Sequence, residues 1–147
     1  MKDADFKNYN HCIGDLQITS WGQEVSTGYK PDLTIRNSNG KLMFIVECEQ
    51  KTDRKAFLGG LIKAEKYAED IGETPGLVFV MQSFDNTTVQ QIGTHLKPYL
   101  SWLSKRQGGL RLSRVVVISD VEYKNSVINN EIICSPSFLK RAFIVAP

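Results

Sequence analysis

Two β-rich runs separated by the dipeptide Asn39-Gly40 are the feature that most constrains the fold of this chain. The first run covers residues 29–36 and the second covers residues 41–49. Asn-Gly is a strong short-range signal for a hairpin, because both residues tolerate the positive φ of a tight turn. The sequence therefore predicts an antiparallel pair of strands, and the second strand runs from an apolar core into two glutamates.

The register of this hairpin decides whether acidic side chains meet. With a two-residue loop, Ser38 pairs with Lys41, and Asp32 lies directly across from Glu47. Side chains alternate between the faces of a strand, so Glu49 shares the face of Glu47. A four-residue loop would keep all three acids on one face, whereas a three-residue loop would not. Opposed residues have Cβ atoms about 5 Å apart, so an even loop predicts one patch of three carboxylates.

Carboxylates this close repel one another and raise their own pKa values unless a cation lies between them. Mg²⁺ suits such a patch, because it takes one or two carboxylates and keeps waters or substrate phosphates as its other ligands. We therefore predict a magnesium site, with Mn²⁺ as a substitute, at Asp32, Glu47 and Glu49. The alternative is that the glutamates end a strand that emerges into solvent. Cys48 points to the other face and is predicted to be a core residue.

Strands and helices alternate after the hairpin. Apolar residues at spacings of three and four predict an amphipathic helix from about Asp53, with Gly72 as its C-terminal cap. Apolar runs at residues 76–82 and 114–120 predict strands that are buried on both faces.

A second helix is predicted between these two strands. Asp85 or Thr87 would cap it, and Pro98 would kink or split it. A short helix within residues 3–12, a strand at 16–26 and a hairpin about Asn129-Asn130 complete the prediction. This order favours one α/β domain, residues 1–147, with a mixed central sheet flanked by helices.

Composition sets wider limits. A chain of 147 residues, 41% of them hydrophobic, suits one domain, and a net charge of +2 permits a polyanionic partner. Cys12, Cys48 and Cys134 are far apart and form no CxxC pair, so neither a disulfide framework nor a zinc site is indicated. The chain shows no signal peptide or apolar run of membrane length, so we expect a soluble, cytoplasmic protein without a membrane partner.

The segments "YKPDLTI" and "FIVECEQK", the hairpin between them and the amphipathic helix that follows resemble the PD-(D/E)xK nuclease superfamily. The motif of that superfamily is Pro-Asp on one strand and acid-x-Lys on the next. Pro31-Asp32 and Glu47 match the motif, while Glu49 stands where the motif has lysine. The resemblance in element order covers roughly residues 16–120.

The resemblance implies a restriction-endonuclease-like fold and magnesium-dependent hydrolysis of DNA phosphodiesters, as in restriction, repair or resolvase enzymes. Asp32 and Glu47 would hold the metal, and Glu49 would be a further ligand or a base. Small enzymes of this fold act as dimers, so a homodimer is expected. The ammonium of the missing motif lysine would come from another lysine, and the candidates are Lys51, Lys63 and Lys66. Glu24, upstream of the motif, could supply an extra acid.

Two groups of basic residues could neutralise phosphates and make binding sensitive to salt. One group lies at the start of the helix after the acids, and the other surrounds Gly108-Gly109. The candidates for nucleic-acid contact in these two groups are Lys51, Arg54, Lys55, Lys105, Arg106, Arg111 and Arg114. Lys63 and Lys66 of the predicted helix are further candidates. A basic loop is also an ordinary solvated surface, and these residues do not separate DNA from RNA.

Three interpretations therefore stay open. The chain is a magnesium-dependent DNA endonuclease, or a non-catalytic nucleic-acid-binding or assembly subunit that keeps a nuclease-like fold, as the glutamate in place of lysine would favour. The third is an unrelated α/β domain in which the three acids never meet.

Overall fold

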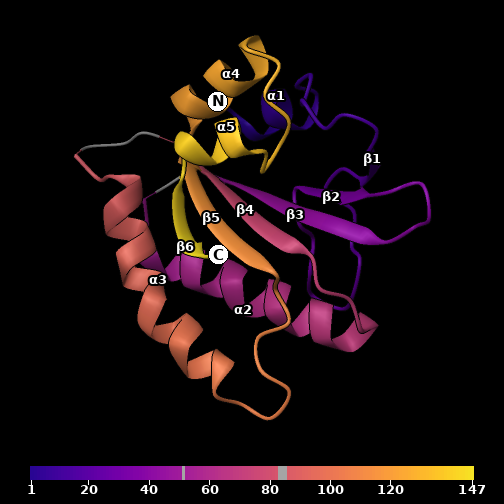
Figure 1. The fold of residues 1–147 in the computed structure, drawn as a ribbon, viewed down its shortest axis with the longest axis vertical. Helices are drawn as coiled ribbons and strands as arrows, with labels where there is room; N and C mark the ends of the chain where they lie inside the picture. The colour runs from indigo at the N-terminus through magenta and orange to yellow at the C-terminus, as the bar shows by residue number, and fades with distance from the viewer. Residues whose placement is uncertain (51, 83–85) are drawn as a thin grey trace.

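Six strands form one mixed sheet in the order β1-β2-β3-β4-β5-β6 in the computed structural model, which describes residues 1–50, 52–82 and 86–147 (Figure 1). The first three strands pair antiparallel, β3, β4 and β5 pair parallel, and β6 pairs antiparallel with β5. The predicted α/β fold class with a mixed sheet is confirmed. The strands are β1 (Gln17–Ser20), β2 (Leu33–Arg36), β3 (Leu42–Glu49), β4 (Gly76–Met81), β5 (Arg114–Ser119) and β6 (Phe143–Ala146).

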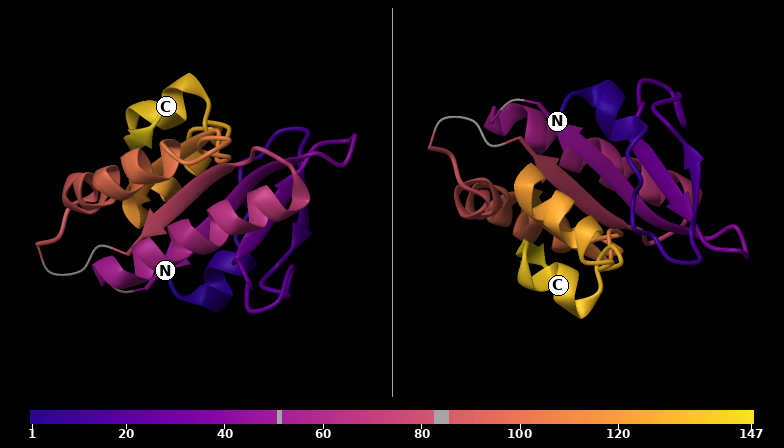
Figure 2. Two further views of the ribbon diagram at one scale, coloured as in Figure 1. Left: turned by 90° about the horizontal axis from the view of Figure 1, so that it is seen from below. Right: turned by 90° about the horizontal axis from the view of Figure 1, so that it is seen from above.

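Helices cover both faces of the sheet, and Figure 2 gives two further views of this arrangement. They are α1 (Asp3–Lys7), α2 (Arg54–Ile71), α3 (Val89–Ser104), α4 (Asp120–Ile128) and α5 (Pro136–Lys140). Helices α2 and α3 pack on one face, and α1, α4 and α5 contribute to the core on the other face. No helix in these described ranges combines the length and the apolar character needed to cross a membrane.

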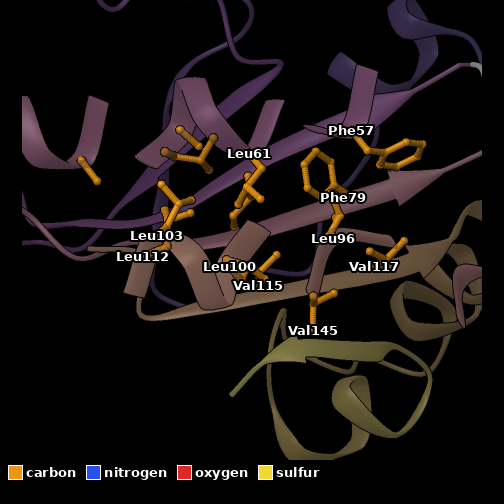
Figure 3. Close-up of a cluster of buried hydrophobic side chains, with 14 of the residues drawn as sticks. Phe57, Leu61, Phe79, Leu96, Leu100, Leu103, Leu112, Val115, Val117 and Val145 are labelled. Atoms are coloured by element: carbon orange, nitrogen blue, oxygen red, sulfur yellow. The ribbon is translucent and has the colours of Figure 1, made fainter. Parts of the chain in front are cut away.

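The larger core lies between the sheet and helices α2 and α3, where leucine and aromatic side chains interlock with β4, β5 and β6 (Figure 3). Phe57 of α2 packs edge-on against Phe79 of β4, with ring centroids 5.2 Å apart. Burying each side chain of this size contributes about 1.5–3 kcal/mol. Cys48 lies in the opposite core, as the alternation of side chains predicted.

The hairpin has a three-residue loop, so the predicted two-residue loop is wrong. The N–H of Asn37 donates to the carbonyl of Lys41 at 3.0 Å, which leaves residues 38–40 as the loop. Only Gly40 of these three has positive φ, at 80°, so the turn is not of the type that Asn-Gly favours. The side chain of Asn37 accepts the N–H groups of Asn39 and Lys41, and this local bonding stabilises the longer turn.

A bulge in the strands cancels the effect of the longer loop. Arg36 pairs with Leu42, but Ile35 pairs with Phe44, so β3 contains one extra residue at this point. From Ile35 towards the start of β2 the pairing is the predicted one, with Leu33 opposite Val46. The acids that follow therefore return to the face that the even-loop register assigned to them.

Helix α2 has the predicted extent, whereas α1 ends at Lys7 and is shorter than predicted. Helix α2 ends at Gly72, which has the left-handed φ of 67° expected of a C-terminal cap. Thr88, and not Thr87, caps α3, because it forms a capping box with Gln91; Asp85 lies outside the described residues. The helix continues through Pro98, so the prediction of a split there is wrong.

The remaining corrections concern both ends of the sheet. Strand β1 ends at Ser20, and residues 21–28 form bends and a turn, with an isolated bridge between Ser26 and Tyr29, in place of the longer strand predicted there. The hairpin predicted about Asn129-Asn130 is wrong. Helix α4 occupies the segment before it, and the N–H of Glu131 donates to the carbonyl of Ser126, which closes the helix end.

Candidate functional site

Reciprocal hydrogen bonds join Asp32 to strand β3. The backbone N–H of Asp32 donates to Oε1 of Glu47 at 3.0 Å, and the backbone N–H of Cys48 donates to Oδ2 of Asp32 at 2.7 Å. Carboxylate oxygens thus take the place of backbone carbonyls just before the start of β2. The predicted meeting of Asp32 and Glu47 is confirmed by this geometry.

Glu49 lies two residues further along β3 and lines the same pocket as Asp32 and Glu47, which we call the acid pocket. The acid pocket has a volume of about 400 Å³. It also contains Asp53 and Lys30, which the sequence analysis did not select. Asp53 caps α2, accepting the N–H of Lys55 at 2.9 Å, so its place just before a helical repeat was the available signal.

Glu47 is the electrostatic centre of the acid pocket. Its side chain is only 9% exposed. Burial, with a further contribution from the charges of Asp32 and Glu49, raises the pKa of Glu47 to about 8, while the N–H of Asp32 and the ammonium of Lys63 oppose the rise. A carboxyl held in its acid form near neutral pH is one that a bound cation would ionise.

Helix α2 covers Glu47 closely because Gly60 has no side chain. A Cβ at this position would lie 3.0 Å from Cε1 of Phe79 and 3.7 Å from Oε2 of Glu47. Lys63 follows three residues later, on the same side of α2, which explains why its charge acts on Glu47. The helix therefore helps to bury Glu47 and carries a cation whose charge acts on it.

Among the described lysines that could replace the motif lysine, Lys63 is the one whose charge acts on Glu47. Lys66 instead donates to Oδ2 of Asp70 at 2.6 Å on the exposed side of α2, and this partner raises the pKa of Lys66. Lys51 lies outside the described residues.

Tyr29 is a further member of the site that the sequence analysis missed. Its side chain is buried, and its hydroxyl oxygen has no hydrogen-bond partner among the described residues. Burial raises the pKa of Tyr29, and the charges of Glu47 and Asp32 raise it further, so the phenol lies close enough to the acids to interact with them. A single tyrosine before a Pro-Asp pair carries no periodic signal that would reveal this.

Glu24 does not belong to the acid pocket. It lies beyond the end of β1 and accepts the N–H of Gly28 at 3.1 Å, within a turn. Glu24 is not among the described residues that line the acid pocket. The prediction that it sits on a strand is wrong, because β1 ends four residues earlier, at Ser20.

The second basic group, around Gly108-Gly109, lies far from the acids. Strands β3, β4 and β5 are parallel, so the segment that enters β5 lies at the opposite end of these strands from Glu49. Here Glu65, 2% exposed, accepts the N–H groups of Arg111 and Leu112 at 2.9 and 3.0 Å.

The charges of this group are largely paired within the protein. Arg106 forms an ion pair with Glu65 at 3.2 Å, and Arg111 approaches Glu69 at 4.0 Å. Arg114 donates to the carbonyl of Cys134 at 3.4 Å, whereas Lys105 is exposed. Arg106 and Arg111 therefore hold the loop before β5 against α2, and the structure does not bring them to the acid pocket.

No protein-family profile matches the chain, and neither a curated protein nor a solved structure matches it. Across the described ranges, no group of three or more His, Cys, Asp or Glu side chains is arranged to hold a metal ion. The acid pocket offers Asp32 and Glu47 as a close pair, with Glu49 further along the strand. Two carboxylates suffice for Mg²⁺, which retains water ligands.

The raised pKa of Glu47 predicts that Glu47→Gln stabilises the protein at alkaline pH. Between about pH 4.5 and pH 8, a glutamate in the unfolded chain loses its proton while folded Glu47 keeps it. The free energy of unfolding therefore falls across this range and levels off above it. We expect Glu47→Gln to be about 1–3 kcal/mol more stable than the parent protein above pH 8, with the gain vanishing near pH 4.5.

Urea unfolding across this pH range measures the difference. Glu24→Gln in the exposed turn is the matched control for loss of one carboxyl. An equal effect of Glu47→Gln at both ends of the range would contradict the assignment.

The buried Glu65 predicts a second stability effect. Glu65→Ala leaves the N–H groups of Arg111 and Leu112 without their acceptor, and we expect a loss of about 2–4 kcal/mol in the free energy of unfolding. Glu69→Ala removes only the more exposed partner of the same arginines and should cost less than about 1 kcal/mol. Chemical denaturation of both variants measures the two losses in the free energy of unfolding. Similar losses in Glu65→Ala and Glu69→Ala would show that Glu65 is not the anchor of this loop.

Proposed function

We propose that the protein is a magnesium-dependent endonuclease that hydrolyses phosphodiester bonds in DNA. The observation that carries the proposal is the linked pair Asp32 and Glu47, two carboxyl groups on one face that open into a pocket with Glu49. The chain order adds support, because Pro-Asp, a hairpin, Glu47 and then an amphipathic helix resemble the PD-(D/E)xK nuclease superfamily. A restriction-endonuclease-like fold is part of this proposal.

The donor chemistry of the acid pocket fits a hard divalent cation. Asp32 and Glu47 would hold Mg²⁺ or Mn²⁺, and Glu49 lies on the same face. The electrostatic strain at Glu47 supports this fit, since a nearby dication would favour the ionised carboxylate. When bound, the ion would make a hydroxide nucleophile accessible near neutral pH and offset charge on the leaving oxygen.

The remaining roles belong to residues of the chain. The ammonium of Lys63 would attract the anionic phosphodiester and stabilise charge that grows on it, in the role of the lysine that Glu49 replaces. Glu49, half-buried at the mouth of the acid pocket, would accept a proton from the attacking water.

Duplex cleavage requires two cuts, and one acid pocket provides one. A homodimer would place a pocket on each strand, and this assembly belongs to the proposal.

A second candidate function is a non-catalytic nucleic-acid-binding or assembly subunit. It is favoured by Glu49 in the motif lysine position and by the way Asp32 and Glu47 are already bonded to backbone N–H groups. In that case the two carboxyl groups would serve only to stabilise the fold, through these hydrogen bonds.

Metal binding to the acid pocket should raise the melting temperature of the protein. Ligands that bind the folded state raise the melting temperature, and we expect saturating MgCl₂ or MnCl₂ to raise it by about 3–8 °C. Asp32→Asn and Glu47→Gln should abolish the rise, while KCl at equal ionic strength controls for screening. A rise that both variants retain would place the metal elsewhere.

Cleavage is tested by incubating plasmid and branched DNA with the protein in MgCl₂ or MnCl₂. We expect Asp32→Asn and Glu47→Gln to lower the rate at least about a hundredfold. Lys63→Gln should lower it about tenfold or more, because it removes charge stabilisation. Lys66→Gln is the matched control, since that lysine is paired with Asp70 on the exposed side of α2. Salt-sensitive binding without cutting would support the second candidate, and absence of both binding and cutting would refute both.

A further inference from the structure

A row of three depressions leads from the acid pocket to helix α3. The second depression, of about 420 Å³, shares Asp53 with the acid pocket, and the third, of about 430 Å³, shares Arg54 with the second. The shared residues make the three continuous around the start of α2. We call this surface the strand path.

The second depression carries the positive charge of the strand path. Arg54 and Lys55 are both exposed there, beside the hydroxyl-bearing Thr52 and Thr87. The side chain of Asp53 accepts the N–H of Lys55 at the helix start, so part of its charge is already used. Two exposed cations next to an acid pocket suit a polyanion that is drawn towards a bound dication.

The third depression offers hydrogen-bonding groups. On the α3 side it is lined by Gln90, Gln91, Thr94 and His95, opposite Arg54 of α2. These amide, hydroxyl and imidazole groups can donate to and accept from the polar edges of nucleobases or sugars. The depression is therefore chemically suited to nucleotides, and not to an apolar partner.

Aromatic rings continue the strand path along α3. His95, Tyr99 and Trp102 follow at spacings of four and three, which places them on one side of the helix. The rings of His95 and Tyr99 have centroids 5.6 Å apart, and Trp102 is 61% exposed. The exposed Lys105 follows at the end of α3. Two exposed rings beside the half-buried His95, with cations at both ends, are a platform on which unpaired bases can stack.

We propose that the strand path binds a single strand of nucleic acid and leads it into the acid pocket. Phosphates would contact Arg54 and Lys55, and bases would stack on His95, Tyr99 and Trp102. A duplex cannot use these rings, because its bases are already stacked on one another. The inference rests on the proposed function for its last step, and it specifies the substrate class as DNA with an unpaired segment beside the cut.

Fluorescence anisotropy tests the strand path without any cleavage. Labelled oligothymidine and a duplex of equal length are titrated with the full chain in EDTA. We expect the single strand to bind more tightly, and Trp102→Ala or Tyr99→Ala to weaken that binding about five- to fiftyfold. Trp21→Ala is the matched control, because Trp21 is 45% exposed but follows β1 at the far edge of the sheet.

The ionic contacts have their own readout. Arg54→Gln should reduce the slope of the logarithm of the binding constant against the logarithm of the salt concentration by about one. Lys41→Gln, at the exposed end of the β2–β3 hairpin, should leave this slope unchanged. In the Trp21→Phe variant, oligothymidine should quench the remaining tryptophan emission, which comes from Trp102. Absence of quenching would overturn the stacking contact whatever the affinity.

Other outcomes would also overturn the strand path. These are equal affinity for single strand and duplex, equal losses in Trp102→Ala and Trp21→Ala, or a dimer that Trp102→Ala dissociates, which would assign the rings to a second copy. The two proposals fail separately. Single-strand binding without metal-dependent cutting refutes the nuclease and keeps the strand path. Cutting that needs Asp32 but is unchanged in Trp102→Ala refutes the strand path alone.

Discussion

The candidate site depends on the exchange of hydrogen bonds between Asp32 and strand β3. Each carboxyl group accepts a backbone N–H from the opposite segment, so the acids continue the ladder of the hairpin beyond its last backbone pair. This arrangement holds two carboxyl groups at close range, and the charge of Asp32 disfavours ionisation of Glu47. The strain is expressed at Glu47, which α2 shields from water and whose pKa is about 8. The close approach of α2 at Gly60 is therefore as much part of the site as the acids.

Two buried glutamates on the same face of the sheet behave differently, and the contrast separates site from scaffold. Glu65 accepts N–H groups from the loop before β5 and pairs with Arg106, so its charge is fully used in folding. Glu47 accepts one N–H and otherwise faces Asp32 and Glu49. A buried carboxyl whose neighbours raise its pKa is a stronger functional indication than burial alone. The same reasoning assigns Arg106 and Arg111 to the scaffold.

The hairpin illustrates how a correct juxtaposition can follow from an incorrect turn. Asn39-Gly40 favoured a two-residue loop, but the side chain of Asn37 stabilises a three-residue turn. The bulge between Ile35 and Arg36 then restores the register. Burial drives this compensation, because a one-residue slip would turn Leu33 and Ile35 of β2 away from the core that they share with Val46. The demand for a buried face thus fixed the placement of Asp32 more firmly than the turn chemistry did.

The sequence alone determined the mixed α/β order, the extent of α2 with its Gly72 cap, and the meeting of Asp32 with Glu47. These follow from local periodicity and from alternation along one hairpin, which act over a few residues. Tertiary structure decided what lies around the acids. The packing of α2 over Glu47, the inward position of Tyr29 and the continuity from Asp53 through Arg54 to α3 arise from contacts between distant segments. Such contacts depend on how helices pack on the sheet, and no spacing within one segment encodes that.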